Sequence, residues 1–232
     1  PTRRSSDLAK TDEQYAKVIK ENTPPLDSVL NHAEYEKLKG SLTGLAIRRG
    51  YFDADMEKSQ LGVSLDNHAS YWDFVFNSGE RYRFGKVNYT GSQIREDYLQ
   101  NIVPFKEGEY YSSEDLAEFN RRLAATGWFN SAVVTPNIAK ARSEGNYLLP
   151  MDAVVTPRSR NYMELGGGFA TDVGPRLNMQ WDKPWINSRG HSLTSNMSIS
   201  KPEQSIGANY KIPLKVNPLE QYYSIQGGYK RT

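Results

Sequence analysis

The C-terminal part of the chain alternates apolar and polar residues, and this pattern constrains the fold more than any other feature. Alternating segments follow one another from about residue 162 to residue 232, separated by clusters of turn-forming residues. Every second position gives the following sets: Met163, Leu165, Gly167 and Phe169; Leu177, Met179 and Trp181; Leu193, Ser195, Met197 and Ile199; Ile206, Ala208, Tyr210 and Ile212; Tyr223, Ile225, Gly227 and Tyr229. The spacing predicts a meander of antiparallel strands.

The two faces of these predicted strands differ in charge. None of the apolar positions is charged, whereas the intervening ones include Glu164, Asp182 and Lys211 with many Asn, Gln and Ser. A soluble sandwich or a lipocalin-like barrel also alternates, but its apolar face packs into a core. Strands of an outer-membrane barrel turn a charge-free face to lipid and keep the other face wet. The polar second face, with aromatics such as Trp185 and Tyr222 near strand ends, favours the membrane barrel.

Composition excludes several classes of function. The formal charge is +2 and basic residues are dispersed among acids, so nucleic acid is not an expected partner. The chain has no cysteine, which excludes disulfides, thiol catalysis and cysteine-based metal sites. No stretch approaches the roughly 20 apolar residues of a membrane helix, so a membrane span would have to consist of strands.

Candidate catalytic and ligand-binding groups are weak. His32, His68 and His191 lie in no metal-ligand spacing and beside no nucleophile motif. We interpret the acidic pair in residues 53–55 as a solvated turn. The glycines of residues 166–168 precede no helix that could bind phosphate, and they fall inside a predicted strand. We expect no enzymatic activity, no metal and no cofactor.

The residues before the alternating segments predict helices and strands in a recurring order. A short helix is expected to begin at Thr11 or Asp12 and to end by residue 25. A longer helix, residues 33–49, places Tyr35, Leu38, Leu42, Leu45 and Ala46 on one side. The other expected elements are strands at 51–63 and 71–77, a strand at 83–89, helices at 93–102 and 112–125, and strands at 128–134 and 148–155.

A glycine followed by two aromatic residues opens the strand after a long helix in both halves of this region. The two junctions are Gly50, Tyr51 and Phe52, and Gly127, Trp128 and Phe129. Glycine can take the left-handed conformation that ends a helix, and the aromatics can pin the strand onto that helix. The repetition indicates two copies of one module.

The order strand, helix, helix, strand, strand resembles the POTRA (polypeptide-transport-associated) domain. Two such modules followed by an antiparallel barrel resemble the BamA-like assembly superfamily. Within it, the segments most similar to the TamA (translocation and assembly module) branch are residues 48–53, 78–85, 125–130, 171–176 and 218–223.

The resemblance implies an α+β fold of POTRA modules (β-α-α-β-β) followed by the N-terminal antiparallel strands of a transmembrane β-barrel. The implied domains are residues 9–79, a module without its opening strand; residues 80–157, a second module; and residues 158–232, the first barrel strands. The chain is therefore expected to be a truncated fragment. It would belong to the outer membrane of a Gram-negative bacterium, with its modules in the periplasm.

The implied function is assembly of outer-membrane proteins and secretion of autotransporters, without a cofactor. The expected partners are outer-membrane lipid, unfolded autotransporter or β-barrel clients, and a TamB-like partner anchored in the inner membrane. Clients would pair with the first barrel strand, residues 161–170, through an edge whose candidate residues are Met163, Leu165, Gly166, Gly167, Gly168 and Phe169. The second strands of the modules are further candidate edges.

Several alternatives remain open. Glycines weaken a strand and its pairing, but they also allow a barrel to curve. Another BamA-like assembly factor, a two-partner secretion transporter, or a passive porin or adhesin barrel would share much of the pattern.

Overall fold

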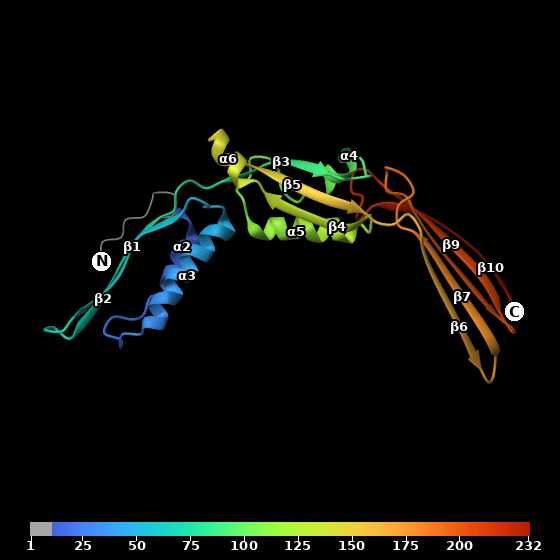
Figure 1. Cartoon of the computed structure of the whole chain (residues 1–232), viewed down its shortest axis with the longest axis horizontal. Coiled ribbons are helices and arrows are strands. Elements are labelled where there is room, and N and C mark those ends of the chain that lie inside the picture. The colour runs from blue at the N-terminus through green and yellow to red at the C-terminus, as the bar shows by residue number, and fades with distance from the viewer. Residues whose placement is uncertain (1–10) are drawn as a thin grey trace. The chain divides into compact units, whose positions relative to one another are not determined.

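The computed structural model describes residues 11–232, which form two compact units, and Figure 1 labels most of their elements. The first unit contains the chain up to Lys86 together with Phe105–Leu116 and Pro136–Met151. The second contains Val87–Pro104, Ala117–Thr135 and Asp152–Thr232.

Two helices and a hairpin begin the first unit. Helix α2 (Glu13–Asn22) starts at Asp12, whose side chain accepts a hydrogen bond from the backbone N–H of Gln14 at 3.1 Å. Helix α3 (His32–Arg49) ends at Gly50, whose φ of 86° is the left-handed conformation expected there. Strands β1 (Asp55–Ser64) and β2 (Ala69–Asn77) pair antiparallel, with a bulge between Met56 and Lys58. The predictions of these two helices are confirmed.

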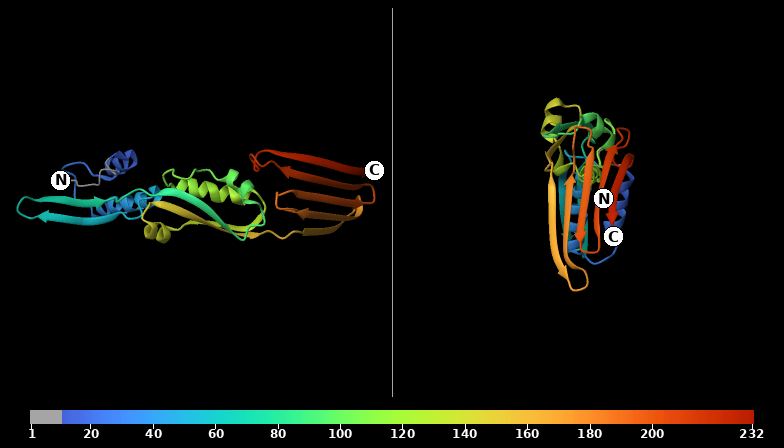
Figure 2. Two further views of the ribbon diagram at one scale, coloured as in Figure 1. Left: turned by 90° about the horizontal axis from the view of Figure 1, so that it is seen from above. Right: turned by 90° about the vertical axis from the view of Figure 1, so that its right-hand side faces the viewer.

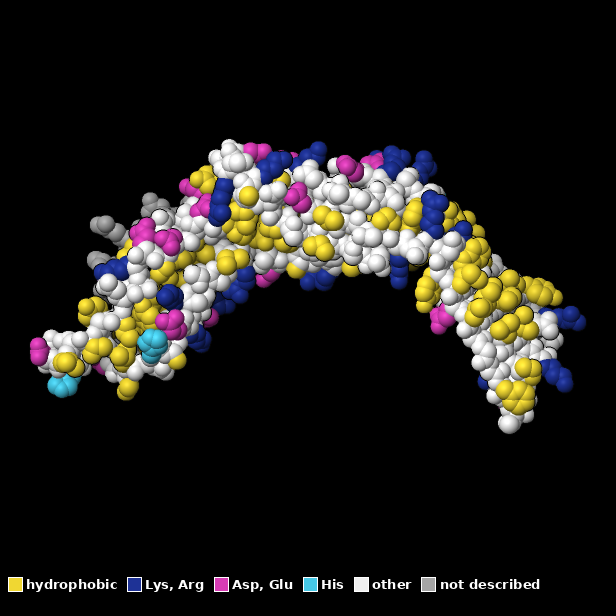
Figure 3. All heavy atoms as spheres, viewed as in Figure 1, with side chains coloured by type: hydrophobic (Ala, Val, Ile, Leu, Met, Phe, Trp, Pro, Cys, Tyr) yellow, Lys and Arg dark blue, Asp and Glu magenta, His cyan; other side chains and the backbone are white. Residues whose placement is uncertain are grey.

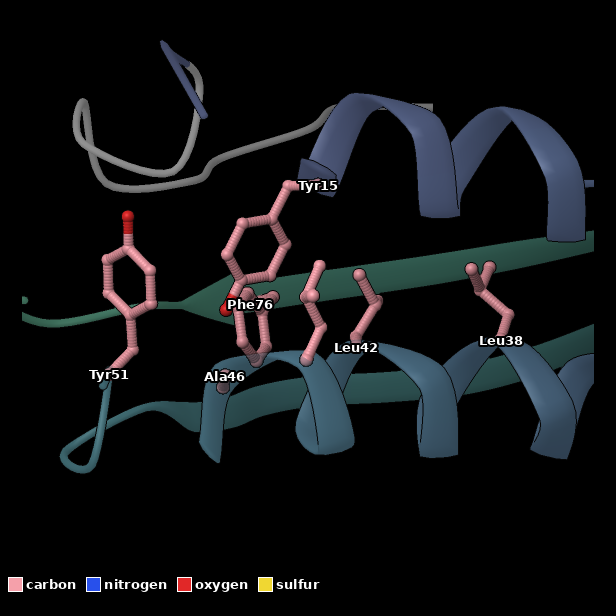
Figure 4. Close-up of a cluster of buried hydrophobic side chains, with 7 residues drawn as sticks. Tyr15, Leu38, Leu42, Ala46, Tyr51 and Phe76 are labelled. Atoms are coloured by element: carbon pink, nitrogen blue, oxygen red, sulfur yellow. The ribbon is translucent and has the colours of Figure 1, made fainter. Parts of the chain in front are cut away.

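The core of this region lies between the helices and the hairpin (Figure 4). Its buried members are Tyr15, Leu38, Leu42, Leu45, Ala46, Tyr51 and Phe76. The predicted stripe of α3 supplies four of these residues, and its fifth member, Tyr35, is also buried. The Tyr35 ring stacks on Phe74 with a centroid distance of 5.0 Å. The helical period therefore identified the buried side of α3 correctly.

A three-stranded sheet of order β3-β5-β4 follows, and β3 and β5 run through both units. Its chain order is β3 (Arg83–Thr90), α4 (Glu96–Leu99), the 3₁₀ turn η1 (Gln100–Ile102), α5 (Ser113–Ala125), β4 (Phe129–Pro136), α6 (Ile138–Glu144) and β5 (Leu148–Pro157). Alternate residues of β5 are buried, namely Leu149, Met151, Ala153 and Val155. β4 lies at one edge of this sheet, and within residues 11–232 β1 pairs with β2 alone.

Five antiparallel strands complete the second unit in the order β10-β9-β8-β7-β6, and Figure 2 shows the open meander. They are β6 (Tyr162–Ala170), β7 (Gly174–Lys183), β8 (Ser192–Ser200), β9 (Gln204–Pro213) and β10 (Tyr222–Arg231). Each neighbour in sequence is the neighbour in the sheet. The predicted fold class, an α+β module followed by antiparallel strands, is confirmed.

Two expectations about local structure were wrong, and one helix was missed. Residues 51–54 form a turn, closed by the Ala54 N–H on the Tyr51 carbonyl at 3.2 Å, so β1 begins only at Asp55. The helix expected at 93–102 is a four-residue α-helix followed by a 3₁₀ turn. Helix α6 was not expected, although Asn137 caps its start and Gly145 ends it with a φ of 66°. Among the described residues, no helix combines the length and apolar character needed to cross a bilayer.

Candidate functional site in the first strand of the open sheet

The strand register joins the apolar positions of all five strands into one face. A row that crosses the whole sheet through directly paired residues consists of Leu165, Met179, Met197, Ile206 and Tyr229. Side chains of alternate residues share a face, so the neighbouring apolar rows lie on the same side. Figure 3 shows hydrophobic side chains gathered over this sheet. The face is exposed in the described part of the chain: Leu165 is 68% and Ile225 is 63% accessible.

The opposite face is polar and hydrogen-bonded. The row next to the apolar one consists of Gly166, Asn178, Ser198, Ser205 and Lys230. Its Ser198 hydroxyl donates to the Asn178 amide oxygen at 2.8 Å. The Ser224 hydroxyl donates to Asn209 at 2.6 Å in the same way. A face with so many polar side chains suits contact with water, because Asn, Ser, Gln and Lys are mostly exposed in folded proteins.

Charged residues appear on the apolar face only at opposite ends of the sheet. Lys183 ends β7 and lies two residues beyond Trp181, with its Nζ 5.1 Å from the centre of the Trp181 ring. Arg231 ends β10 at the far end, opposite Gln204. The apolar stretch of β10 from Tyr223 to Tyr229 rises about 20 Å at about 3.4 Å per residue. That height is close to the apolar band of roughly 25 Å on outer-membrane barrels.

Strand β6 is an edge of this sheet, because in the part of the chain that the structure describes it pairs only with β7. The nine residues Tyr162–Ala170 pair with β7 from Tyr162↔Asp182 to Ala170↔Gly174. All nine are exposed except Ala170. The outward N–H and C=O groups of such a strand are a template for another strand.

The three glycines of β6 are not required by local crowding. A Cβ built on Gly166 or Gly168 would meet nothing within 4 Å, and one on Gly167 would lie 4.0 Å from the Arg176 carbonyl oxygen. By contrast, a Cβ on Gly207 in β9 would lie 2.7 Å from the Asn196 Oδ1 atom. The β6 glycines therefore remove side-chain packing from an edge that has room for it.

The segment leading into β6 is held by indole groups. The Trp185 Nε1–H donates to the Arg158 carbonyl at 2.7 Å, and the Trp181 Nε1–H donates to the Asn161 Oδ1 atom at 3.2 Å. The Arg158 N–H donates to the Trp128 carbonyl at 3.0 Å. The beginning of β6 is thus fixed by side chains that the sequence did not associate with it.

The first glycine-aromatic junction is a packed joint within the first unit. A Cβ on Gly50 would lie 2.8 Å from the Tyr111 Cβ atom, and the Phe52 ring contacts those of Tyr82 and Tyr111 at 5.5 and 5.0 Å. The Tyr51 hydroxyl donates to the Asp12 carboxylate at 3.1 Å. Burial of Tyr51 and the nearby Asp12 charge raise the pKa of Tyr51 to about 12.

Asp53 lies exposed in a turn, as the sequence had suggested, but its side chain also binds two other residues. Its carboxylate accepts hydrogen bonds from the Tyr82 hydroxyl at 2.6 Å and from Arg142 Nε at 2.9 Å. The Arg142 guanidinium also donates to the Phe52 carbonyl at 3.2 Å. Burial of Tyr82 and its hydrogen bond to Asp53 raise the pKa of Tyr82 to about 12. The sequence could not show this because Asp53 and Arg142 are far apart along the chain.

The second junction makes different contacts within the second unit. Gly127 has a φ of 71°, similar to Gly50, and both Trp128 and Phe129 are buried. The Trp128 Nε1–H donates to the Gly190 carbonyl at 3.1 Å. Gly190 has a φ of 75°, and a Cβ there would lie 2.3 Å from the indole ring. The two junctions share their backbone conformation, but their aromatics bind different surfaces.

The histidines and acids form no evident reactive centre. Among the described residues, no group of three His, Asp or Glu side chains is placed to hold a metal ion. His191 shares a hydrogen bond with the Tyr210 hydroxyl at 2.8 Å. His68 lies in the β1–β2 turn, and His32 lies 4.0 Å from Glu36 on the surface of α3.

Comparisons with known proteins agree with this architecture. Residues 82–156 match the family model described as POTRA, surface antigen variable number repeat. The chain is similar to a crystal structure of BamA from Haemophilus ducreyi lacking POTRA domains 1–3, with a TM-score of 0.69 and 16% identity over 98% of this chain and 41% of that one. It is also similar to CdiB from Acinetobacter baumannii, with a TM-score of 0.53 and 14% identity over 98% of this chain and 43% of that one.

These structural matches concern the fold, because the identities are low. The chain spans about two fifths of the length of these two structures, 41% and 43%. The family match shows that residues 82–156 form a POTRA domain, and a sheet of five antiparallel strands follows it.

Proposed function

We propose that the chain is part of an outer-membrane protein assembly or secretion factor. Its POTRA domain would lie in the periplasm, and its five-stranded sheet would face lipid. One observation carries this proposal: the register produces an exposed apolar face whose central rows carry no charge, directly after a POTRA domain. A sheet of this kind needs lipid or a second apolar layer to cover it.

The proposed mechanism uses the free side of β6. A client that enters a bilayer must satisfy every backbone hydrogen bond, because the hydrocarbon offers no water. An unpaired strand edge supplies those partners one residue at a time and needs no nucleotide or metal. The exposed glycines of residues 166–168 favour this role, since pairing at this edge gains little from side-chain packing.

The finer proposal is a factor of the TamA type, which assists autotransporter secretion together with a TamB-like partner in the inner membrane. Its support is the set of sequence segments that resemble that branch, including residues 78–85 and 218–223. Another BamA-like assembly factor or a two-partner secretion transporter would use the same edge. A passive porin or adhesin would not need one.

Disulfide crosslinking of the full-length protein in outer-membrane fractions tests the edge. Leu165→Cys in β6 should crosslink to a cysteine in the terminal strand of a stalled β-barrel client. The control is Leu193→Cys in β8, which lies on the same apolar face but inside the sheet. Equal crosslinking at the two positions, or none at either, would contradict the proposal and would be the result for a passive barrel.

A further inference from the structure

Three of the four tryptophans surround the short segment that leads into β6. They come from different elements: Trp128 precedes β4, Trp181 is near the end of β7, and Trp185 follows β7. Each makes a hydrogen bond to residues 158–161, through the Trp128 carbonyl and through the indole N–H groups of Trp181 and Trp185. The Arg160 guanidinium also stacks over the Trp185 ring at 4.5 Å.

These tryptophans are themselves held in place. Trp128 is 3% accessible, and its carbonyl accepts a second hydrogen bond from the Gln93 side chain at 2.7 Å. Its indole packs against Gly190, in the same loop as Trp185. The Arg95 N–H holds that loop a second time by donating to the Ser188 carbonyl at 3.0 Å. The support is therefore a connected set of contacts within the second unit, in which each member restricts the next.

The other half of β6 has no such support. Phe169 is 76% accessible, and the three preceding residues are the glycines that have no side chains to pack. Beyond Ala170, residues 171–173 make the turn to β7, and Gly174 begins β7 with a φ of 77°. Strand β6 is thus anchored at its beginning and weakly held at its middle and end.

We propose that Trp128, Trp181 and Trp185 are positioning residues that fix the beginning of β6, so that this strand moves first at residues 166–168. The anchoring is inferred from the contacts described above. Its role in client entry rests on the proposed function. An incoming strand would then meet a fixed edge at the beginning of β6 and a mobile edge at residues 166–168.

Hydrogen–deuterium exchange of the full-length protein in lipid nanodiscs tests the anchor without any client. Two variants remove one hydrogen bond each at half-buried or exposed positions: Trp185→Phe, which keeps an aromatic ring, and Asn161→Ala. Loss of one hydrogen bond should speed exchange in peptides covering 158–163 by about fivefold. Exchange in 166–170 should already be fast and should not change.

Trp72→Phe is the matched control, because Trp72 packs against Tyr35 and Phe74 in the first unit. It should leave exchange in residues 158–163 unchanged. Heat-modifiable mobility on gels identifies the folded samples. If Trp185→Phe prevents folding, Asn161→Ala still tests the proposal. Unchanged exchange at 158–163 in both variants would overturn the proposal, as would stronger protection at 166–170 than at 158–163 in the unaltered protein. Neither result depends on whether clients crosslink to Leu165→Cys.

Discussion

At the scale of single residues, the first unit depends on tyrosines whose hydroxyls are turned toward carboxylates. Tyr51 donates to Asp12, and Tyr82 donates to Asp53. The side chain of Asp12 is 5% accessible and is also paired with Arg49 at 2.9 Å. Tyr51 and Tyr82 are both buried, and an ionised phenol would meet a like charge on the neighbouring carboxylate, so the fold favours the neutral tyrosine.

This arrangement predicts a loss of stability at high pH. The pKa of both tyrosines rises from 10.0 in the unfolded chain to about 12 in the fold. A raised pKa means that the stabilisation is complete below about pH 10 and is lost as the pH rises through about 12. Tyr51→Phe removes one such group, so the alkaline unfolding of the full-length protein should move to higher pH. Circular dichroism during a pH titration measures it.

The control for that titration is Tyr71→Phe. Tyr71 lies in the same region of the chain but is 61% accessible. Its removal should leave the alkaline transition where it is. A transition that shifts equally in both variants, or in neither, would show that the contact between Tyr51 and Asp12 does not govern it.

At the scale of elements, β6 and β10 both contain adjacent glycines but differ in what those glycines meet. A Cβ on Gly228 in β10 would lie 3.1 Å from the Ile206 carbonyl oxygen, whereas Gly166 and Gly168 in β6 have open space. Crowding therefore accounts for one glycine of β10 and for none of those in β6. The glycines of β6 are then explained either by weak strand pairing or by strand curvature. Substitution of these glycines distinguishes the two explanations.

Replacing Gly166, Gly167 and Gly168 together by alanine should strengthen the β6 edge. Alanine fits the available space and loses less backbone entropy on folding, by roughly 0.5–1 kcal/mol for each residue. If weak pairing is the function, the variant folds and its client crosslinking falls severalfold. Gly227→Ala in β10, where a Cβ would also meet nothing within 4 Å, is the matched control and should crosslink normally. Loss of the heat-modifiable form in the triple variant would instead favour curvature.

How far the sequence predicts these elements depends on the distance over which their signals act. The period-two pattern placed the beginning of β6 within one residue, and the glycine after α3 ended that helix where expected. These signals are local. The indole contacts at residues 158–161 and the bond between Asp53 and Arg142 join segments far apart in sequence, so no spacing reveals them. Helix α6 was missed although the sequence contains residues typical of helix ends, Asn137 at its start and Gly145 at its end.

At the scale of the whole molecule, the central question is which solvent the apolar face of the sheet meets. The proposed function requires lipid there, but a second apolar layer would also cover the face. Both kinds of cover exclude an unpaired charge from the apolar face, so the cover itself is identified by the fraction that holds the folded, unaltered protein, outer membranes or soluble. A lysine at the bilayer midplane of a barrel costs about 2–4 kcal/mol on the lipid face, while wet positions tolerate it.

Adjacent residues of β7 make that comparison within a single strand. Met179 lies in the apolar row that crosses all five strands, and Asn178 lies in the neighbouring polar row. Met179→Lys should reduce the folded, heat-modifiable form in outer-membrane fractions. Met179 is two rows from the strand end that carries Lys183, so a lysine there would lie within the apolar band and not at its border. Asn178→Lys adds the same charge one residue away on the wet face and should assemble normally. Equal assembly of the two variants would mean that this face does not meet lipid. Equal failure would mean that both faces of the sheet are covered, and it would contradict the assignment of a wet face.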